Sequence, residues 1–242
     1  ITEEVAKYDE VYAEWAPNEK VAMETALGAS IAGARSFCGM KHVGLNVAAD
    51  PLYTAGYTGV NAGMVIAVAD DQGMHSSQNE QDSRFYGKFA LIPVFEPSNQ
   101  QEAYDMMAAA FDYSEAIKEP VLLRVVTRLA HSRAGVNIKE PRKQNDIHIS
   151  TDAWVLLPAI ARRKYEVLIE KQKAMIEASK VSDFNRTEIS ESDNKEKKTG
   201  IVACGIGYNY VKEALAKLPE EQQALYNIET VSQYPIPEER IQ

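Results

Sequence analysis

The sequence predicts an α/β protein with a doubly wound, mainly parallel sheet. Two apolar runs, residues 63–70 and 120–127, are continuous rather than alternating, as in parallel strands that are covered on both faces. Segments of helical character separate the apolar runs, and this alternation is typical of parallel sheets with right-handed crossovers. The chain of 242 residues is long enough for one large α/β domain or two smaller ones.

The segment from Asn18 to Arg35 predicts a helix made largely of alanine and glycine. Asn18 fits the helix cap, and Glu19 lies in the first turn beside the positive end of the helix dipole. We expect this small-residue helix to be buried, with Glu19 as a functional acid at its N-terminus. The alternative is that Glu19 only stabilises the helix through its interaction with the helix dipole. The elements expected around it are a helix over 2–14, a strand over 37–43, a turn at 44–46 and a helix over 47–58.

A polar stretch, residues 70–84, follows the first core strand. Ligands of doubly wound sheets gather outside the carboxyl ends of the strands, so chemistry is expected in this loop. His75, Ser76 and Gln78 are its candidate ligand-binding residues, and a merely solvated loop is the alternative. The elements expected after it are a helix over 79–90, a strand over 93–97, a helix over 99–118 and the core strand at 120–127.

The composition changes after Arg133. Residues 134–156 are expected to form a loop, and residues 158–179 a charged helix. Few apolar residues occur in 182–198, as is typical of a solvated linker. The predicted organisation is a first domain over 1–180 ending in that helix, a charged linker over 181–198, and the start of a second α/β domain over 199–242. That second unit is expected to be truncated, because too few residues remain to complete an α/β domain.

The composition also excludes several classes of protein. A net charge of −9 argues against a nucleic-acid surface. No apolar run reaches the length of a membrane span, and the acidic N-terminus is no signal peptide. Cys38 and Cys204 lie in apolar contexts outside any CxxC motif, which predicts buried free thiols in a reducing compartment. Two cysteines are also too few to hold an iron–sulfur cluster by themselves. We therefore expect a cytoplasmic protein without nucleic-acid or membrane partners.

Other motifs of the sequence carry weaker signals. Gly205 and Gly207 follow a strand, but Tyr210 occupies the third glycine position of a dinucleotide fingerprint, so a tight strand-to-helix turn is the preferred interpretation. A GxSxG nucleophile motif is absent. The spacing of Asp70, Asp71 and His75 matches no metal-ligand pattern, and we predict no metal site.

The regular spacing of alanine and glycine after Asn18–Glu19 resembles the pyrimidine-binding module of thiamine diphosphate enzymes. Further segments narrow this resemblance to the alpha subunits of the indolepyruvate ferredoxin oxidoreductases, a family of thiamine diphosphate-dependent 2-oxo acid:ferredoxin oxidoreductases. The likeness extends over residues 1–175, and residues 200–215 are similar to the start of the next domain of that subunit, of the transketolase C-terminal-like type. The segments that carry the narrower resemblance are residues 40–51, 69–82 and 123–133.

The resemblance implies an oxidative decarboxylation. Such enzymes convert an aryl 2-oxo acid such as indolepyruvate, coenzyme A and oxidised ferredoxin into the aryl-acetyl-CoA, carbon dioxide and reduced ferredoxin. A glutamate at the position of Glu19 contacts N1′ of the cofactor's aminopyrimidine in this superfamily, so Glu19 is the expected catalytic and cofactor-binding residue. Loop position suggests that His42 and Asn46 line the cofactor side and that the substrate side is lined by His75, Ser76 and Gln78.

The resemblance further implies Mg²⁺ and [4Fe-4S] clusters bound outside these residues, a beta subunit and dimerisation. In chains of this family, the module that binds the diphosphate and a cysteine-rich part follow later in the sequence. A segment with a threonine precedes the first helix. None of these three segments is in this sequence. We therefore expect an inactive fragment of a larger enzyme. A related oxidoreductase with an aliphatic or dicarboxylic 2-oxo acid and a non-catalytic structural subunit are the alternatives.

Overall fold

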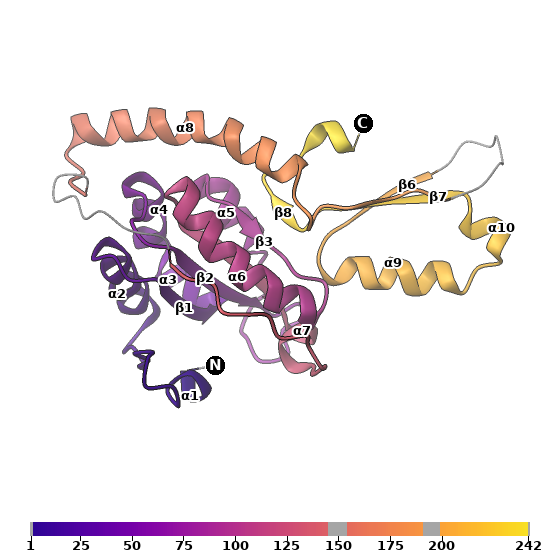
Figure 1. Cartoon of the computed structure of the whole chain (residues 1–242), viewed down its shortest axis with the longest axis horizontal. Helices are drawn as coiled ribbons and strands as arrows, with labels where there is room; N and C mark the ends of the chain where they lie inside the picture. The colour runs from indigo at the N-terminus through magenta and orange to yellow at the C-terminus, as the bar shows by residue number, and fades with distance from the viewer. Residues whose placement is uncertain (1, 145–153, 191–198, 242) are drawn as a thin grey trace.

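The computed structural model describes residues 2–144, 154–190 and 199–241 and contains two sheets (Figure 1). The larger sheet has the strand order β1–β2–β4–β3–β8. Its first four strands are parallel, whereas β8 runs antiparallel to β3, so the predicted mainly parallel α/β sheet is confirmed. The strands of this sheet are β1 (Ser36–Lys41), β2 (Met64–Asp70), β3 (Val94–Phe95), β4 (Val121–Val126) and β8 (Gln233–Tyr234).

Helices cover both faces of this sheet. One apolar cluster joins the inner sides of α2, α3, α4 and α5 to β1 and β2, and a second cluster lies beneath α6 on the opposite face. Along β2, Met64 and Ile66 belong to the first cluster and Val65 to the second, which explains the continuous apolar run. The helices up to residue 180 are α1 (Thr2–Val5), α2 (Glu19–Ile31), α3 (His42–Val47), α4 (Ala49–Thr58), α5 (Arg84–Ala90), α6 (Gln100–Ile117), α7 (Thr127–His131) and α8 (Pro158–Lys180).

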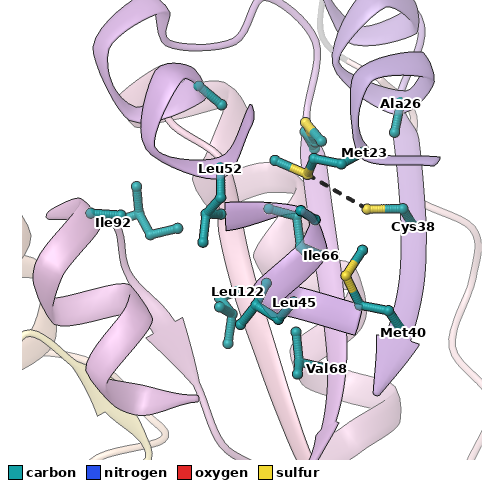
Figure 2. Close-up of a cluster of buried hydrophobic side chains, with 14 of the residues drawn as sticks. Met23, Ala26, Cys38, Met40, Leu45, Leu52, Ile66, Val68, Ile92 and Leu122 are labelled. Atoms are coloured by element: carbon teal, nitrogen blue, oxygen red, sulfur yellow. Dashed lines mark hydrogen bonds between the residues drawn. The ribbon is translucent and has the colours of Figure 1, made fainter. Parts of the chain in front are cut away.

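Figure 2 shows the first cluster, in which α2 packs on β1. The Sγ atom of Cys38 lies 3.9 Å from the Sδ atom of Met23, and both side chains are buried. Burial raises the pKa of the Cys38 thiol to about 12, because a thiolate would lose its hydration there. Cys38 is therefore the inert buried thiol that the sequence predicted. Cys204 is also a free thiol, but the prediction that it is buried is wrong, because it is only partly buried.

Helix α2 confirms the predicted cap and corrects two other expectations. The Oδ1 atom of Asn18 accepts a hydrogen bond from the Val21 N–H at 3.0 Å. The helix ends at Ile31 rather than near Arg35, and Gly33 follows with a φ of 99°. The expected burial of the helix is confirmed only for one side, since Met23, Ala26 and Ser30 are buried and its other residues are at least partly exposed.

Four other predicted elements also differ from the structure. The helix expected over 2–14 is limited to Thr2–Val5, whose residues bury no side chain that could hold a longer amphipathic helix. The strand expected over 37–43 ends at Lys41, and the expected turn at 44–46 belongs to α3. The helix expected over 79–90 begins only at Arg84, because side-chain hydrogen bonds hold the preceding residues in a loop.

The C-terminal residues form a smaller sheet of order β5–β7–β6, with β6 and β7 parallel. Part of the predicted linker is structured, because β5 pairs with β7 and Asn185 is buried. The rest of that linker, residues 191–198, lies outside the described residues. So do residues 145–153 of the loop expected over 134–156. The division of the chain at 181–198 stays a prediction. The elements here are β5 (Thr187–Glu188), β6 (Thr199–Ala203), α9 (Ile206–Ala216), α10 (Glu220–Gln223), β7 (Tyr226–Thr230) and the 3₁₀ helix Glu238–Arg240.

The turn between β6 and α9 packs against the end of β3. Gly205 begins α9 with a φ of 48°, which confirms the tight turn predicted from its sequence. A Cβ atom on Gly205 would lie 2.6 Å from Cγ of Glu96, so a side chain is sterically excluded. The Nδ2 atom of Asn209 donates to the Ser98 carbonyl at 2.7 Å, and these contacts join the second sheet to the first.

None of the helices within the described ranges has the length and apolar character needed to cross a membrane.

We predict that Gly205→Ala destabilises the chain by about 2 kcal/mol, because it combines a positive φ with a clash against a buried side chain. Urea denaturation measures this change. Gly207→Ala is the matched control two residues along, where an added Cβ meets no atom within 4 Å. Equal stability of the two variants would contradict the packing described for the turn.

A partly buried ion pair joins helix α8 to the segment that precedes β4. The Nζ atom of Lys171 lies 2.5 Å from Oε1 of Glu119, whose side chain is 2% exposed. Burial raises the pKa of Glu119 to about 7, although the positive charge of Lys171 acts in the opposite direction. The folded chain therefore binds a proton at Glu119 more tightly than the unfolded chain does.

This pKa shift predicts a specific pH dependence of stability. Because the folded pKa is raised, Glu119 contributes stability at pH 5.5 that is lost as the pH rises through 7, by about 1–2 kcal/mol between pH 5.5 and 8. Glu119→Gln should remove that contribution, as measured by urea denaturation at both pH values. Glu170→Gln, on the exposed face of α8, is the control. A Glu119→Gln chain with the full wild-type pH dependence would refute the assignment.

Candidate functional site

Polar residues gather where the strands of the larger sheet end. Asp70 is the last residue of β2, Thr127 follows β4, and His42 follows β1. Residues 71–83 form a loop that side chains of all three neighbouring strand ends hold in place. The position of this loop agrees with the expectation that chemistry lies at the carboxyl edge of a doubly wound sheet.

The carboxyl group of Glu19 lies directly on the backbone of α3. A Cβ atom on Gly44 would lie 2.6 Å from Oε1 of Glu19 and 2.5 Å from its Cγ. A side chain at position 44 would therefore force this carboxyl group to move from its place. Since Gly44 stands between His42 and Asn46 in the same short helix, the structure brings together the segments that carry all three predicted cofactor-side residues.

His42 is completely buried and serves first as an anchor. Its Nε2 atom is 2.9 Å from the carbonyl oxygen of Asn79, and a carbonyl can only accept, so the proton of a neutral ring is on Nε2. The Nδ1 atom is buried and has no hydrogen-bond partner within the described part of the chain. An unpaired acceptor of this kind fits a donor group of a ligand.

Asn46 is exposed at the opposite end of α3. Its Oδ1 atom accepts a short hydrogen bond from the hydroxyl group of Tyr86 on α5. This bond orients the Asn46 side chain but also uses one of its polar atoms. The cofactor-side role of Asn46 stays a prediction.

Asp71 organises the loop that carries the predicted substrate-side residues. Its carboxylate accepts the Ser76 N–H at 2.7 Å and the His75 N–H at 3.1 Å, and it also accepts the Thr127 hydroxyl at 2.9 Å. These donors, led by the Ser76 N–H, hold the pKa of Asp71 far below its usual range. The loop backbone is thus fixed while the side chains of His75, Ser76 and Gln78 remain exposed for a ligand.

Lys41 is a residue of this edge that the sequence interpretation missed. Its Nζ atom donates to the Ser76 carbonyl at 2.6 Å and lies 3.0 Å from the Ser76 hydroxyl oxygen. The signal that could have identified it is positional, since Lys41 is the last residue of β1. A cation at the end of a strand, immediately before His42, belongs to the same edge as the predicted site.

A second missed residue, Arg124, lies buried beneath the loop. Its guanidinium group bonds Asp70 at 2.6 Å and Glu96 at 2.5 Å, and so joins β2, β4 and the end of β3. Asp70 in turn accepts the backbone N–H of Ser83 at 2.9 Å, together with a short bond from the Ser83 hydroxyl. The end of the loop is therefore anchored to a buried ion pair. Its signal in the sequence was a single arginine within the apolar run at 120–127.

These residues fit the aminopyrimidine part of thiamine diphosphate. Glu19 supplies a carboxyl group, Gly44 leaves the space in which that group lies, and His42 holds an unpaired buried nitrogen. No group of three or more His, Cys, Asp or Glu side chains that could hold a metal ion exists within residues 2–144, 154–190 and 199–241.

Comparison with known proteins identifies the family. The family model described as "Pyruvate flavodoxin/ferredoxin oxidoreductase, thiamine diP-bdg" (thiamine diphosphate-binding) matches residues 1–177. Two curated relatives, each named "Indolepyruvate oxidoreductase subunit IorA", come from Archaeoglobus fulgidus (45% identity over 237 residues) and Pyrococcus abyssi (46% over 241 residues). Each alignment covers 96% of this chain but only 36% of the relative, so the chain spans 36% of the length of these proteins.

The fold has a counterpart among solved structures. It is similar to "2-oxoglutarate:ferredoxin oxidoreductase from Magnetococcus marinus with 2-oxoglutarate, coenzyme A and succinyl-CoA bound", with a TM-score of 0.73 and 16% sequence identity. The similarity covers 99% of this chain and 50% of that chain, and at this identity it establishes the fold alone. Because the family model matches residues 1–177, and the resemblance seen around Glu19 agrees with it, the chain belongs to the thiamine diphosphate-binding family of the pyruvate flavodoxin/ferredoxin oxidoreductases.

Proposed function

We propose that this chain is the pyrimidine-binding part of an enzyme that oxidatively decarboxylates aryl 2-oxo acids such as indolepyruvate. The observation that carries the proposal is the carboxyl group of Glu19, which rests on Gly44 at the carboxyl edge of the sheet. Relatives named as indolepyruvate oxidoreductase subunits support the choice of an aryl substrate. The complete reaction would transfer the acyl group to coenzyme A and electrons to ferredoxin.

Glu19 would be the catalytic residue of this part of the enzyme. Thiamine diphosphate, when bound, supplies the electron sink that allows a 2-oxo acid to lose carbon dioxide. The Glu19 carboxyl group would share a proton with N1′ of the aminopyrimidine, and its contact with Gly44 would help to hold it in position. His42 would offer its unpaired Nδ1 atom as an acceptor on the same side, and Asn46 would border the site.

The substrate side is assigned to the loop that Asp71 fixes. His75, Ser76 and Gln78 present their side chains on a backbone that is already held in place, so little ordering is needed when a ligand binds. Mg²⁺ and the [4Fe-4S] clusters would be bound by parts of the enzyme beyond this chain. We further propose a beta subunit, dimerisation, a cytoplasmic location, and no turnover by these 242 residues alone.

We predict that Glu19→Gln lowers kcat of the complete enzyme by about 10²–10⁴-fold, because the amide cannot exchange a proton with N1′. The measurement is indolepyruvate-dependent reduction of ferredoxin, with assembly checked by size-exclusion chromatography. Glu24→Gln is the matched control, since Glu24 lies in the same helix and is exposed. Full activity of an assembled Glu19→Gln enzyme would reduce the proposal to a structural subunit.

Substrate class is tested separately. We predict a higher kcat/KM of the complete enzyme for indolepyruvate and phenylpyruvate than for pyruvate and 2-oxoglutarate. The same ferredoxin assay measures all four acids. A preference for pyruvate or 2-oxoglutarate would keep the reaction type but replace the aryl substrate.

A further inference from the structure

Lys41 carries a charge that no carboxylate in the described residues balances. Both hydrogen-bonding partners of its ammonium group, the carbonyl and the hydroxyl of Ser76, are neutral. The side chain is half-buried at the end of β1, so solvent alone does not surround it. An ammonium group has three N–H donors, and these two contacts leave one for a further acceptor.

Two arginines near this edge are already paired with carboxylates. Arg84 bonds Asp82 at 2.6 Å, and Arg124 lies between Asp70 and Glu96. The guanidinium group of Arg128 lies over the ring of Tyr210, 5.4 Å from its centroid. Lys41 differs from Arg84 and Arg124 in holding only neutral oxygens, so an anion that binds Lys41 would displace no ion pair.

The position of Lys41 also relates it to Glu19. Lys41 is the N-cap of α3, and Gly44, on which Glu19 rests, lies three residues further along. Lys41 therefore stands at the start of the short helix against which Glu19 lies, and its ammonium group contacts the loop at Ser76.

We propose that Lys41 binds the carboxylate of the 2-oxo acid substrate, an inference that rests on the function proposed above. A 2-oxo acid carries a carboxylate next to its ketone, so its binding site needs a group that recognises this carboxylate. The third N–H of Lys41 would donate to a carboxylate oxygen, and the adjacent Ser76 hydroxyl would donate to the same group. Lys41 is thereby a substrate-binding residue and sets the orientation of the bond that breaks when carbon dioxide leaves.

The test compares Lys41→Met and Lys41→Arg in the complete enzyme. We expect Lys41→Met to raise KM for indolepyruvate about 10–100-fold, as for the loss of one charge-assisted hydrogen bond. Lys41→Arg should restore most of the affinity, because it keeps the positive charge. Lys20→Met, on the exposed surface of α2, is the control and should leave KM unchanged.

A neutral analogue separates substrate binding from loop anchoring. In 1-(indol-3-yl)propan-2-one a methyl group replaces the carboxylate, so its inhibition constant should be the same for wild type and Lys41→Met. If that constant rises in parallel with KM, Lys41 only holds the loop, and the proposal is overturned. A rise in KM for coenzyme A without one for indolepyruvate would also overturn it, since the cation would then serve a phosphate.

The two proposals fail in different ways. A wild-type enzyme that assembles but does not oxidise any 2-oxo acid rejects the proposed function. Calorimetric titration with indolepyruvate then still decides the role of Lys41. Weaker binding to Lys41→Met than to wild type supports the assignment, and equal binding rejects it.

Discussion

The interaction on which the rest of the structure depends is the buried ion pair of Arg124 with Asp70 and Glu96. The guanidinium group of Arg124 joins residues at or near the carboxyl ends of three strands. Asp70 also accepts a hydrogen bond from Ser83 at the end of the loop. Charges buried in this way are stable only when every partner is present, and loss of one partner costs about 3–5 kcal/mol. The edge that carries the candidate site is therefore rigid before any ligand arrives.

The same cluster connects the two sheets. Glu96 contacts Arg124 on one side and the backbone of Gly205 on the other, so the β6–α9 turn covers part of the charged group. Residues far apart in the chain thus share one carboxylate. The β6–α9 turn and the loop are therefore connected by the two ion pairs of Arg124.

Local sequence patterns anticipated the features that local forces determine. The continuous run at 63–70 became a strand covered on both faces, and Asn18 became the cap of α2. Contacts between side chains far apart in the chain could not be predicted from these local patterns. Lys41 and Arg124 are recognisable as site residues only when their partners Ser76 and Glu96 are known to be adjacent. The extent of α2 burial likewise depends on what packs against it, which alanine content does not specify.

The close contact between Glu19 and Gly44 makes position 44 informative for reading related sequences. A side chain at this position would occupy the space of the carboxyl group, so the two residues are coupled by volume rather than by charge. A relative that keeps the fold but has lost the acid is free to accept alanine or a larger residue there. We therefore expect glycine at position 44 in related sequences that carry the glutamate at position 19.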